Sequence, residues 1–485
     1  MGLGDGGPPH GEGPNREESE STVSLDNAMH QMSIEQMELP FEPRGAAPSI
    51  ERSGEARSAG QGTERSGLDG PQLMERIVEP GNLTQALTRV RRNQGSPGVD
   101  GRTVGELPAY LRDHWPSIRE DLLMGRYQPS VIKRVELPKP DGGMRLLGIP
   151  TVLDRLIQQA VLQILQPAID PMFSEDSFGF RPGRSAQQAI CQAQRYVQEE
   201  RHWVVDVDLA QFFDRVNHDI LMSLMAKRIA DPRVLTLLRR YLEAGVMVTG
   251  VVVKRHEGTP QGGPLSPLLA NVLLDVVDRA LERRGHAFVR YADDCNVYVE
   301  SRRAAERVME GLVGLYAKLK LQINPTKSAV APAGERAFLG FRFYRVVRGK
   351  IVKRQASPKA IDKMKARVRK MTARSNGWSL THVVSMLRRY LLGWQAYFRL
   401  AETPSVFATI DGWIRRRLRA LIIYQSRHGR KLFRLLRARG VPVHAAATAA
   451  RHSRRYWAIA AHVALSIAFP AQYFDTLGVP RLGPA

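Results

Sequence analysis

The chain has 485 residues, 43% hydrophobic and 25% charged, and these ordinary globular values exclude wholesale disorder, a collagen-like fibre and a disulfide-stapled miniprotein. A chain of this length suggests about three domains or subdomains. Its 71 Lys and Arg residues outnumber 48 Asp and Glu residues, and the net charge of +23 favours a polyanionic partner such as nucleic acid.

The N-terminal residues 1–70 differ in composition from the rest of the chain. They contain 13 acidic and 5 basic residues, are rich in Gly, Ser, Pro and Glu, and show no sustained apolar period, which predicts a disordered acidic tail. No run of about 18 apolar residues follows, so we expect no membrane partner. The two cysteines, Cys191 and Cys295, are too few for a disulfide framework and favour a reducing, cytoplasmic location.

Helical and strand patterns alternate over residues 71–345, which predicts an α+β fold. In chain order we expect a hairpin around the turn at 140–143, a helix over 151–167 ended by Pro167, a strand over 203–209, a helix over 266–275, a hairpin over 287–300 that turns at Asp293-Asp294, and a helix over 303–320. The Pro-Asp-Gly-Gly turn at 140–143 is flanked by the cations Lys139 and Arg145, which are placed to grip a phosphate.

The C-terminal part is helical and strongly basic. Residues 341–460 contain 29 basic and 3 acidic residues. Four aromatic residues share one helical face and are expected to be core: Tyr390, Trp394, Tyr397 and Phe398. The arginines around them, and a basic helix pair over 414–440, are better placed for phosphate contacts with RNA: Arg388, Arg389, Arg415, Arg416 and Arg417.

Three carboxylates are the strongest chemical signal. Asp208 stands at the end of a predicted strand, and Asp293 and Asp294 stand at a predicted hairpin tip. Adjacent carboxylates repel each other unless a cation compensates, and three carboxylates on neighbouring strands can hold two Mg²⁺ ions. Such a pair of ions suits nucleotidyl transfer from a triphosphate to a 3′-hydroxyl. A plain Asp-Asp turn is the alternative at 293–294.

Four segments in the same order resemble the motifs of reverse transcriptases: 136-ELPKPDGGMRLLGIP-150 in the fingers, and 206-DVDLAQFFDRVNHD-219, 257-EGTPQGGPLSPLLANVLLD-275 and 290-RYADDCNVYV-299 in the palm. Two further segments, 177-SFGFRPGRSAQQAI-190 and 390-YLLGWQAYF-398, resemble bacterial group II intron-encoded reverse transcriptases and maturases in particular. The resemblance covers about residues 71–430.

This resemblance implies a right-hand polymerase, with fingers and palm over 71–345, an α-helical thumb/maturase domain over 346–440, and a C-terminal extension of unknown role over 441–485. It makes Asp208 and Asp293 ligands of both Mg²⁺ ions and Asp294 a more peripheral third carboxylate. The implied nucleotide-binding residues are Lys139, Arg145, Phe213 as a steric gate against the 2′-hydroxyl, Gln261 near the template base, and Lys327 as a proton donor to pyrophosphate. Arg181 and Arg184 are expected to hold template phosphate.

The resulting hypothesis is an RNA-directed DNA polymerase that also promotes group II intron splicing and retrohoming. Its expected partners are the intron RNA, an RNA template with a DNA primer, target DNA and dNTPs, and it would associate with the nucleoid when bound to its DNA target. Three alternatives stay open: a free-standing reverse transcriptase without a splicing role, an RNA-binding splicing cofactor without polymerase activity, and an RNA-dependent RNA polymerase, which a steric gate at Phe213 disfavours.

Overall fold

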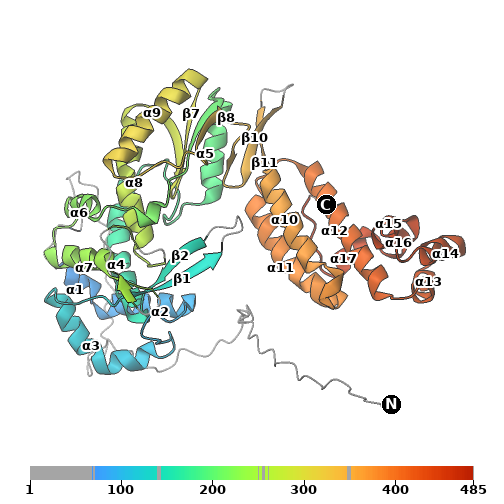
Figure 1. Cartoon of the computed structure of the whole chain (residues 1–485), viewed down its shortest axis with the longest axis horizontal. Coiled ribbons are helices and arrows are strands. Elements are labelled where there is room, and N and C mark those ends of the chain that lie inside the picture. The colour runs from blue at the N-terminus through green and yellow to red at the C-terminus, as the bar shows by residue number, and fades with distance from the viewer. Residues whose placement is uncertain are drawn as a thin grey trace, which may run out of the picture.

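The computed structural model describes residue 68 and residues 72–138, 144–248, 251–253, 257–259, 262–346 and 351–483. Figure 1 shows a rounded N-terminal half that contains sheets and helices, and a helical C-terminal half that extends from it. The predicted α+β architecture with a helical C-terminal domain is confirmed. The predicted tail lies outside the described residues except for Leu68, which is 1% exposed and therefore belongs to the core. No helix in the described ranges is long and apolar enough to cross a membrane.

The fingers combine helices with a four-stranded sheet of order β2-β1-β4-β5. The strands are β1 (Ile132–Pro138), β2 (Met144–Ile149), β4 (Val246–Val248) and β5 (Val251–Val253), and the helices are α1 (Leu73–Ile77), α2 (Pro80–Asn93), α3 (Leu107–Leu123), α4 (Val152–Ile169), α6 (His218–Ala226) and α7 (Pro232–Glu243). β1 and β2 pair as the predicted antiparallel hairpin.

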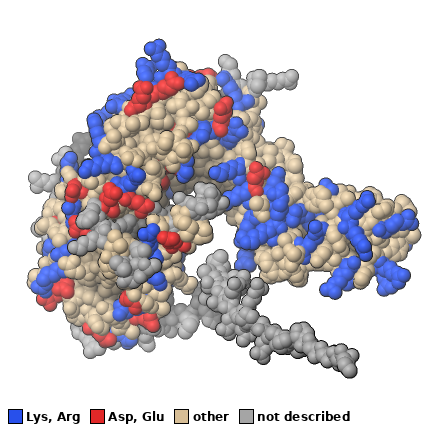
Figure 2. Space-filling model, viewed as in Figure 1, with Lys and Arg blue, Asp and Glu red and all other residues tan. Residues whose placement is uncertain are grey.

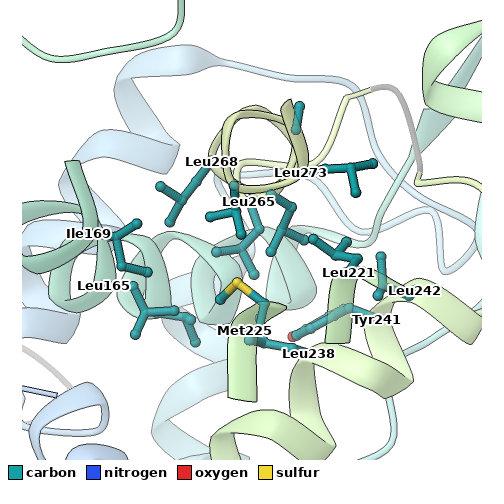
Figure 3. Close-up of a cluster of buried hydrophobic side chains, with 14 of the residues drawn as sticks. Leu165, Ile169, Leu221, Met225, Leu238, Tyr241, Leu242, Leu265, Leu268 and Leu273 are labelled. Carbon is teal, nitrogen blue, oxygen red and sulfur yellow. The ribbon is translucent and has the colours of Figure 1, made fainter. Parts of the chain in front are cut away.

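Helix α4 shows how local sequence sets an element. Its N-cap Thr151 accepts a hydrogen bond from the Asp154 backbone N–H. We expected this helix to end at Pro167, but it continues to Ile169. A proline so close to the C-terminal end interrupts little of the hydrogen-bond ladder. The apolar face of α4 packs with α6, α7 and α8 (Ser266–Arg283) in a cluster that includes Leu165, Met225 and Leu268 (Figure 3).

The palm is a four-stranded antiparallel sheet of order β6-β7-β3-β8. Its strands are β3 (Trp203–Val207), β6 (Ala287–Tyr291), β7 (Asp294–Val299) and β8 (Ala329–Pro332). Helices α8 and α9 (Arg302–Lys318) cover one face, with Val205 and Val297 in that core, whereas α5 (Ala186–Gln198) covers the other, with Val204 and Val289. The short 3₁₀ turns η1 (Asp170–Met172) and η2 (Phe212–Asp214) connect these elements.

The second hydrophobic core continues from α5 into the C-terminal half, so the palm and the basic helices are packed together. A small sheet, β9 (Ala337–Phe338), β10 (Phe341–Val346) and β11 (Ile351–Ala356), forms the junction, where the Val352 backbone N–H donates to Gln198 Oε1 at 2.7 Å. The helical elements that follow are α10 (Pro358–Met371), η3 (Arg374–Asn376), α11 (Leu380–Phe398), α12 (Pro404–Gln425) and α13 (Gly429–Ala438). The aromatic stripe on α11 lies in this core as expected, with Phe398 buried.

The C-terminal extension, for which the sequence indicated no role, packs back on the basic helices over its described residues 441–483. They form α14 (Val443–Arg451), α15 (Tyr456–Ile459), α16 (Val463–Ala468) and α17 (Ala471–Thr476). The backbone N–H of Leu482 donates to both carboxylate oxygens of Asp411 on α12, at 3.1 and 3.0 Å. This segment is therefore part of the helical domain's packing, at least as far as Gly483.

Candidate active site

The fold brings the three predicted carboxylates to one end of the palm sheet. Asp208 directly follows β3, and β3 pairs with β7 in a register that places Val207 opposite Cys295. The β6–β7 hairpin turns at Ala292 and Asp293, because Tyr291 pairs with Asp294. We expected the turn one residue later. The register instead makes Asp294 the first residue of β7 and leaves only Asp293 within the turn.

Burial and the neighbouring carboxylates both disfavour the charged form of Asp294. Burial, followed by the charges of Asp293, Asp208 and Asp206, raises the pKa of Asp294 to about 7. Close anionic groups of this kind favour a bound cation, which removes the repulsion. The site therefore has the electrostatic character of a cation-binding site.

The donor set suits Mg²⁺ with substrate better than a closed metal cage. Among the described residues, no group of three acidic, histidine or cysteine side chains is close enough to hold a metal ion by itself. Mg²⁺ commonly takes one or two carboxylates and completes its shell with water and substrate phosphates. Asp208 and Asp293, with Asp294 beside them, provide donors of that kind.

A second layer of contacts fixes Asp208. Its backbone N–H donates to Ser328 Oγ at 2.9 Å, and its carboxylate lies 3.6 Å from Lys327 Nζ. Asp206, two residues earlier, is held by an ion pair with Arg336 at 2.6 Å. Arg336 also donates to the Lys327 carbonyl at 2.6 Å, so it connects the two acidic residues to the lysine loop. The sequence placed Lys327 near the site but gave no signal for the roles of Ser328 and Arg336.

Arg290, which the sequence analysis did not single out, holds the turn that carries Asp293 through a hydrogen bond to its backbone. Its side chain is fully buried and forms an ion pair with Asp278 at 2.6 Å, whose side chain is also fully buried. The same guanidinium donates to Asn271 Oδ1 at 2.8 Å and to the Ala292 carbonyl at 2.9 Å. Ala292 adopts φ +58°, so a side-chain donor fixes an uncommon backbone conformation next to Asp293.

The motif at 177–185 packs against this hairpin. Ser177 forms an isolated parallel bridge with Arg290 and accepts a hydrogen bond from its guanidinium at 2.7 Å. Gly179 lies so close to the turn that a Cβ there would come within 2.1 Å of the Ala292 nitrogen, and only glycine fits. The motif thus supports the hairpin that carries Asp293 and Asp294.

Two arginines of that motif, Arg181 and Arg184, contact other residues of the protein. The Arg181 side chain is 3% exposed, pairs with Asp170 and donates to the carbonyls of Ser174 and Ser177, so our prediction of a phosphate contact there is wrong. Arg184 is ion-paired with Glu175 but remains partly exposed. Spacing in the sequence did not reveal Asp170, the partly exposed acidic partner of the buried Arg181.

The neighbouring residues Phe212 and Phe213 differ in burial. Phe212 is 3% exposed and belongs to the core, whereas Phe213 lines a cavity of about 500 Å³ between fingers and palm. Leu147, Phe180 and Gly262 line the same cavity. Gly262 has φ +130° and approaches β2 closely, because a Cβ there would lie 2.7 Å from the Gly148 carbonyl oxygen. Lys139, Gln261 and the side chain of Arg145 lie outside the described residues.

The basic C-terminal residues fall into two groups. Arg388 and Arg389 are exposed on α11, where they are open to a partner. Arg415 is 4% exposed and ion-paired with Asp411 and with Asp475 at 2.6 Å, so our expectation of an RNA contact by Arg415 is wrong. Arg416 and Arg417, on the same helix, are partly exposed.

Comparison with known proteins adds independent findings. Residues 137–343 match the family model described as reverse transcriptase (RNA-dependent DNA polymerase), and residues 361–440 match the group II intron, maturase-specific domain. Protein YkfC of Escherichia coli (strain K12) is 33% identical over 316 residues, which cover 56% of this chain and 83% of that protein. The group II intron-encoded protein LtrA of Lactococcus lactis subsp. cremoris is 39% identical over 209 residues, 43% of this chain and 35% of that protein.

A solved structure, a partial Cas6-RT-Cas1--Cas2 complex, contains a chain that is 28% identical, with 51% of this chain and 42% of that chain covered. Its TM-score of 0.33 is too low to support a structural argument. The matched residues cover most of the length of YkfC but about a third of the length of LtrA.

Proposed function

The chain belongs to the group II intron-encoded reverse transcriptases and maturases, and on that premise we propose that it copies intron RNA into DNA with two Mg²⁺ ions and assists the splicing of the same RNA. One observation carries the polymerase part of this proposal. Asp208 directly follows β3 and Asp293 lies in the turn before β7, so both stand at one end of two paired strands, within the residues that match the reverse transcriptase model.

The residues around this site have roles in the proposed reaction. Asp208 and Asp293 would hold both ions, which when bound lower the pKa of the primer 3′-hydroxyl and neutralise charge on the triphosphate. Lys327, 3.6 Å from Asp208, would donate a proton to the departing pyrophosphate. Phe213 would pack beneath the sugar and exclude a 2′-hydroxyl.

Lys139 and Arg145 would grip the triphosphate and Gln261 would contact the template base, as the resemblance implies. In the maturase domain, Arg388 and Arg389 are exposed on α11 and would contact intron RNA, and Arg184 remains a candidate for template phosphate. The match of residues 361–440 to the maturase-specific domain weighs against a free-standing reverse transcriptase. Retrohoming into target DNA, with association to the nucleoid at that step, completes the proposal.

A splicing assay separates the two activities. A precursor RNA that carries the intron in which this reading frame lies would be incubated with wild-type protein or Asp293→Asn at low Mg²⁺. We expect both proteins to accelerate splicing, because the substitution removes a charge from the palm and leaves the helical domain intact. Failure of both proteins to accelerate splicing, with RNA bound, would contradict the maturase role. Loss in the variant alone would show that the two activities share the metal site.

A further inference from the structure

The helical domain contains a pocket whose cations have no acidic partner among the described residues. Thr372, Arg374, Arg417, Ala420 and Trp457 line a cavity of about 190 Å³, which we call the arginine pocket. One water molecule occupies roughly 30 Å³ in the liquid, so the pocket has room for a larger polar group. Its walls come from α12, α15, η3 and Thr372, which follows α10. Figure 2 shows the domain's surface crowded with Lys and Arg and nearly free of acidic residues on the visible face.

The two pocket cations, Arg374 and Arg417, and the adjacent Arg416 contact neutral groups. Arg417 Nε donates to Thr372 Oγ1 at 2.6 Å, and Arg416 donates to the Trp457 carbonyl at 2.9 Å. The Arg374 guanidinium lies 4.7 Å from the centre of the Tyr456 ring, and that of Arg416 lies 4.2 Å from the Trp457 ring. Within the described part of the chain, none of these three arginines has a carboxylate in salt-bridge range.

The neighbouring Arg415 differs from the pocket arginines in having acidic partners. It lies on the same helix, but it is buried and neutralised by two carboxylates, Asp411 and Asp475. The positive charge of Arg417, in contrast, is disfavoured by its surroundings, because burial and the charges of Arg369 and Arg374 lower its pKa. A cluster of like charges in a partly buried pocket is stabilised when an anion enters it.

Resting on the proposed function, we infer that the arginine pocket binds one backbone phosphate of an unpaired RNA nucleotide, and that the Trp457 indole stacks on an adjacent base. Guanidinium groups suit phosphate oxygens, and Trp457 is 42% exposed, so its indole is accessible to a base. Recognition of unpaired RNA typically combines phosphate contacts with stacking on aromatic rings. A base-paired strand would not offer its base to Trp457.

Four variants of the full chain test this inference: Arg374→Gln, Arg417→Gln, Trp457→Ala, and the control Arg434→Gln, which removes one exposed charge from α13. The probe is a fluorescein-labelled single-stranded RNA, measured by anisotropy over a series of salt concentrations and compared with the same strand in a duplex. We expect either pocket arginine variant to weaken single-strand binding roughly tenfold and to reduce the salt slope by about 0.7, the value for one phosphate on a single strand. Trp457→Ala should weaken binding about tenfold with an unchanged slope.

The outcomes are distinguishable. Arg374 is exposed, so Arg374→Gln tests the pocket even if Arg417→Gln destabilises the domain by losing its bond to Thr372. Pocket variants that bind like Arg434→Gln would overturn this inference while leaving the proposed function standing. Equal losses for single-stranded and duplex RNA would overturn the stacking role of Trp457. Wild-type protein that binds neither RNA would refute the proposed function itself.

Discussion

Replacing Arg290 with Met should destabilise the fold strongly, because it leaves a buried carboxylate without its counter-ion. Arg290 and Asp278 are both fully buried, and three contacts of 2.6–2.9 Å join them. Removal of one partner of a buried ion pair typically costs about 3–5 kcal/mol. That loss is a large part of the roughly 5–15 kcal/mol that stabilises an ordinary domain.

The double variant Arg290→Met/Asp278→Leu separates stability from positioning. An apolar pair of similar volume is often as stable as the ion pair it replaces, so we expect most of the lost stability to return. Polymerase activity should not return, because Met cannot donate to the Ala292 carbonyl that Arg290 holds at 2.9 Å beside Asp293. Arg302→Met is a matched control, since Arg302 is 71% exposed and pairs with Glu306 on the surface of α9.

Stability is measured as the midpoint and free energy of urea unfolding, and activity as primer extension at a temperature where all the proteins are folded. Arg290→Met that unfolds like Arg302→Met would refute the role of the buried ion pair. A double variant that regains wild-type activity together with stability would refute the positioning of the turn by Arg290.

Two further predictions concern the nucleotide pocket and the C-terminal segment. Phe213→Ala should reduce discrimination against ribonucleotides by roughly 10- to 200-fold, the range for small changes in an apolar pocket. Phe180→Ala, a control in the same cavity, should leave the dNTP-to-rNTP ratio of kcat/KM unchanged. Equal ratios in the two variants would show that Phe213 is not the steric gate. Burial raises the pKa of Asp475, but hydrogen bonds from Arg481 and Arg415 outweigh this and hold the pKa below its usual value. The stability from Asp475 is therefore present near neutral pH and is lost as pH falls through the lowered pKa. The melting temperature of Asp475→Asn should lie below that of the wild type at pH 7 and approach it toward pH 3, and a constant difference would contradict the ionic role.

The chemistry of the palm could be predicted from the sequence because it depends on local patterns. A β-branched strand that ends at Asp208 and a hairpin that carries Asp293 were evident from alternation and turn residues. Which residue began β7 was not evident, because the pairing of Tyr291 with Asp294 is a matter of register between strands. Asp tolerates turn positions well, so the sequence favoured a turn at both aspartates, whereas the structure places Ala292 at positive φ.

The sequence did not predict which arginines are buried in ion pairs. Arg181 and Arg415 stand in basic, exposed-looking surroundings, yet each is buried against an acidic partner that is 11 or 60 residues away along the chain. Nothing in the sequence around Arg290 indicates that its side chain holds the turn next to Asp293. Long-range ion pairs depend on how helices and strands pack, and composition or spacing does not encode them residue by residue. The same applies to residues 441–483, whose packing on α12 follows from contacts such as that of Leu482 with Asp411.

The central claim is that the carboxylates at the end of β3 and β7 catalyse DNA synthesis on RNA. The most direct measurement is primer extension by the purified full chain on an RNA template with a DNA primer, dNTPs and Mg²⁺. Wild-type protein and Asp219→Asn, a control at an aspartate whose side chain is 78% exposed on α6, should incorporate dNTPs equally. Asp293→Asn should lose incorporation by roughly a thousandfold, equivalent to several kcal/mol of metal-dependent stabilisation, while it binds RNA as tightly as the wild type. Extension by Asp293→Asn at the wild-type rate would contradict the account.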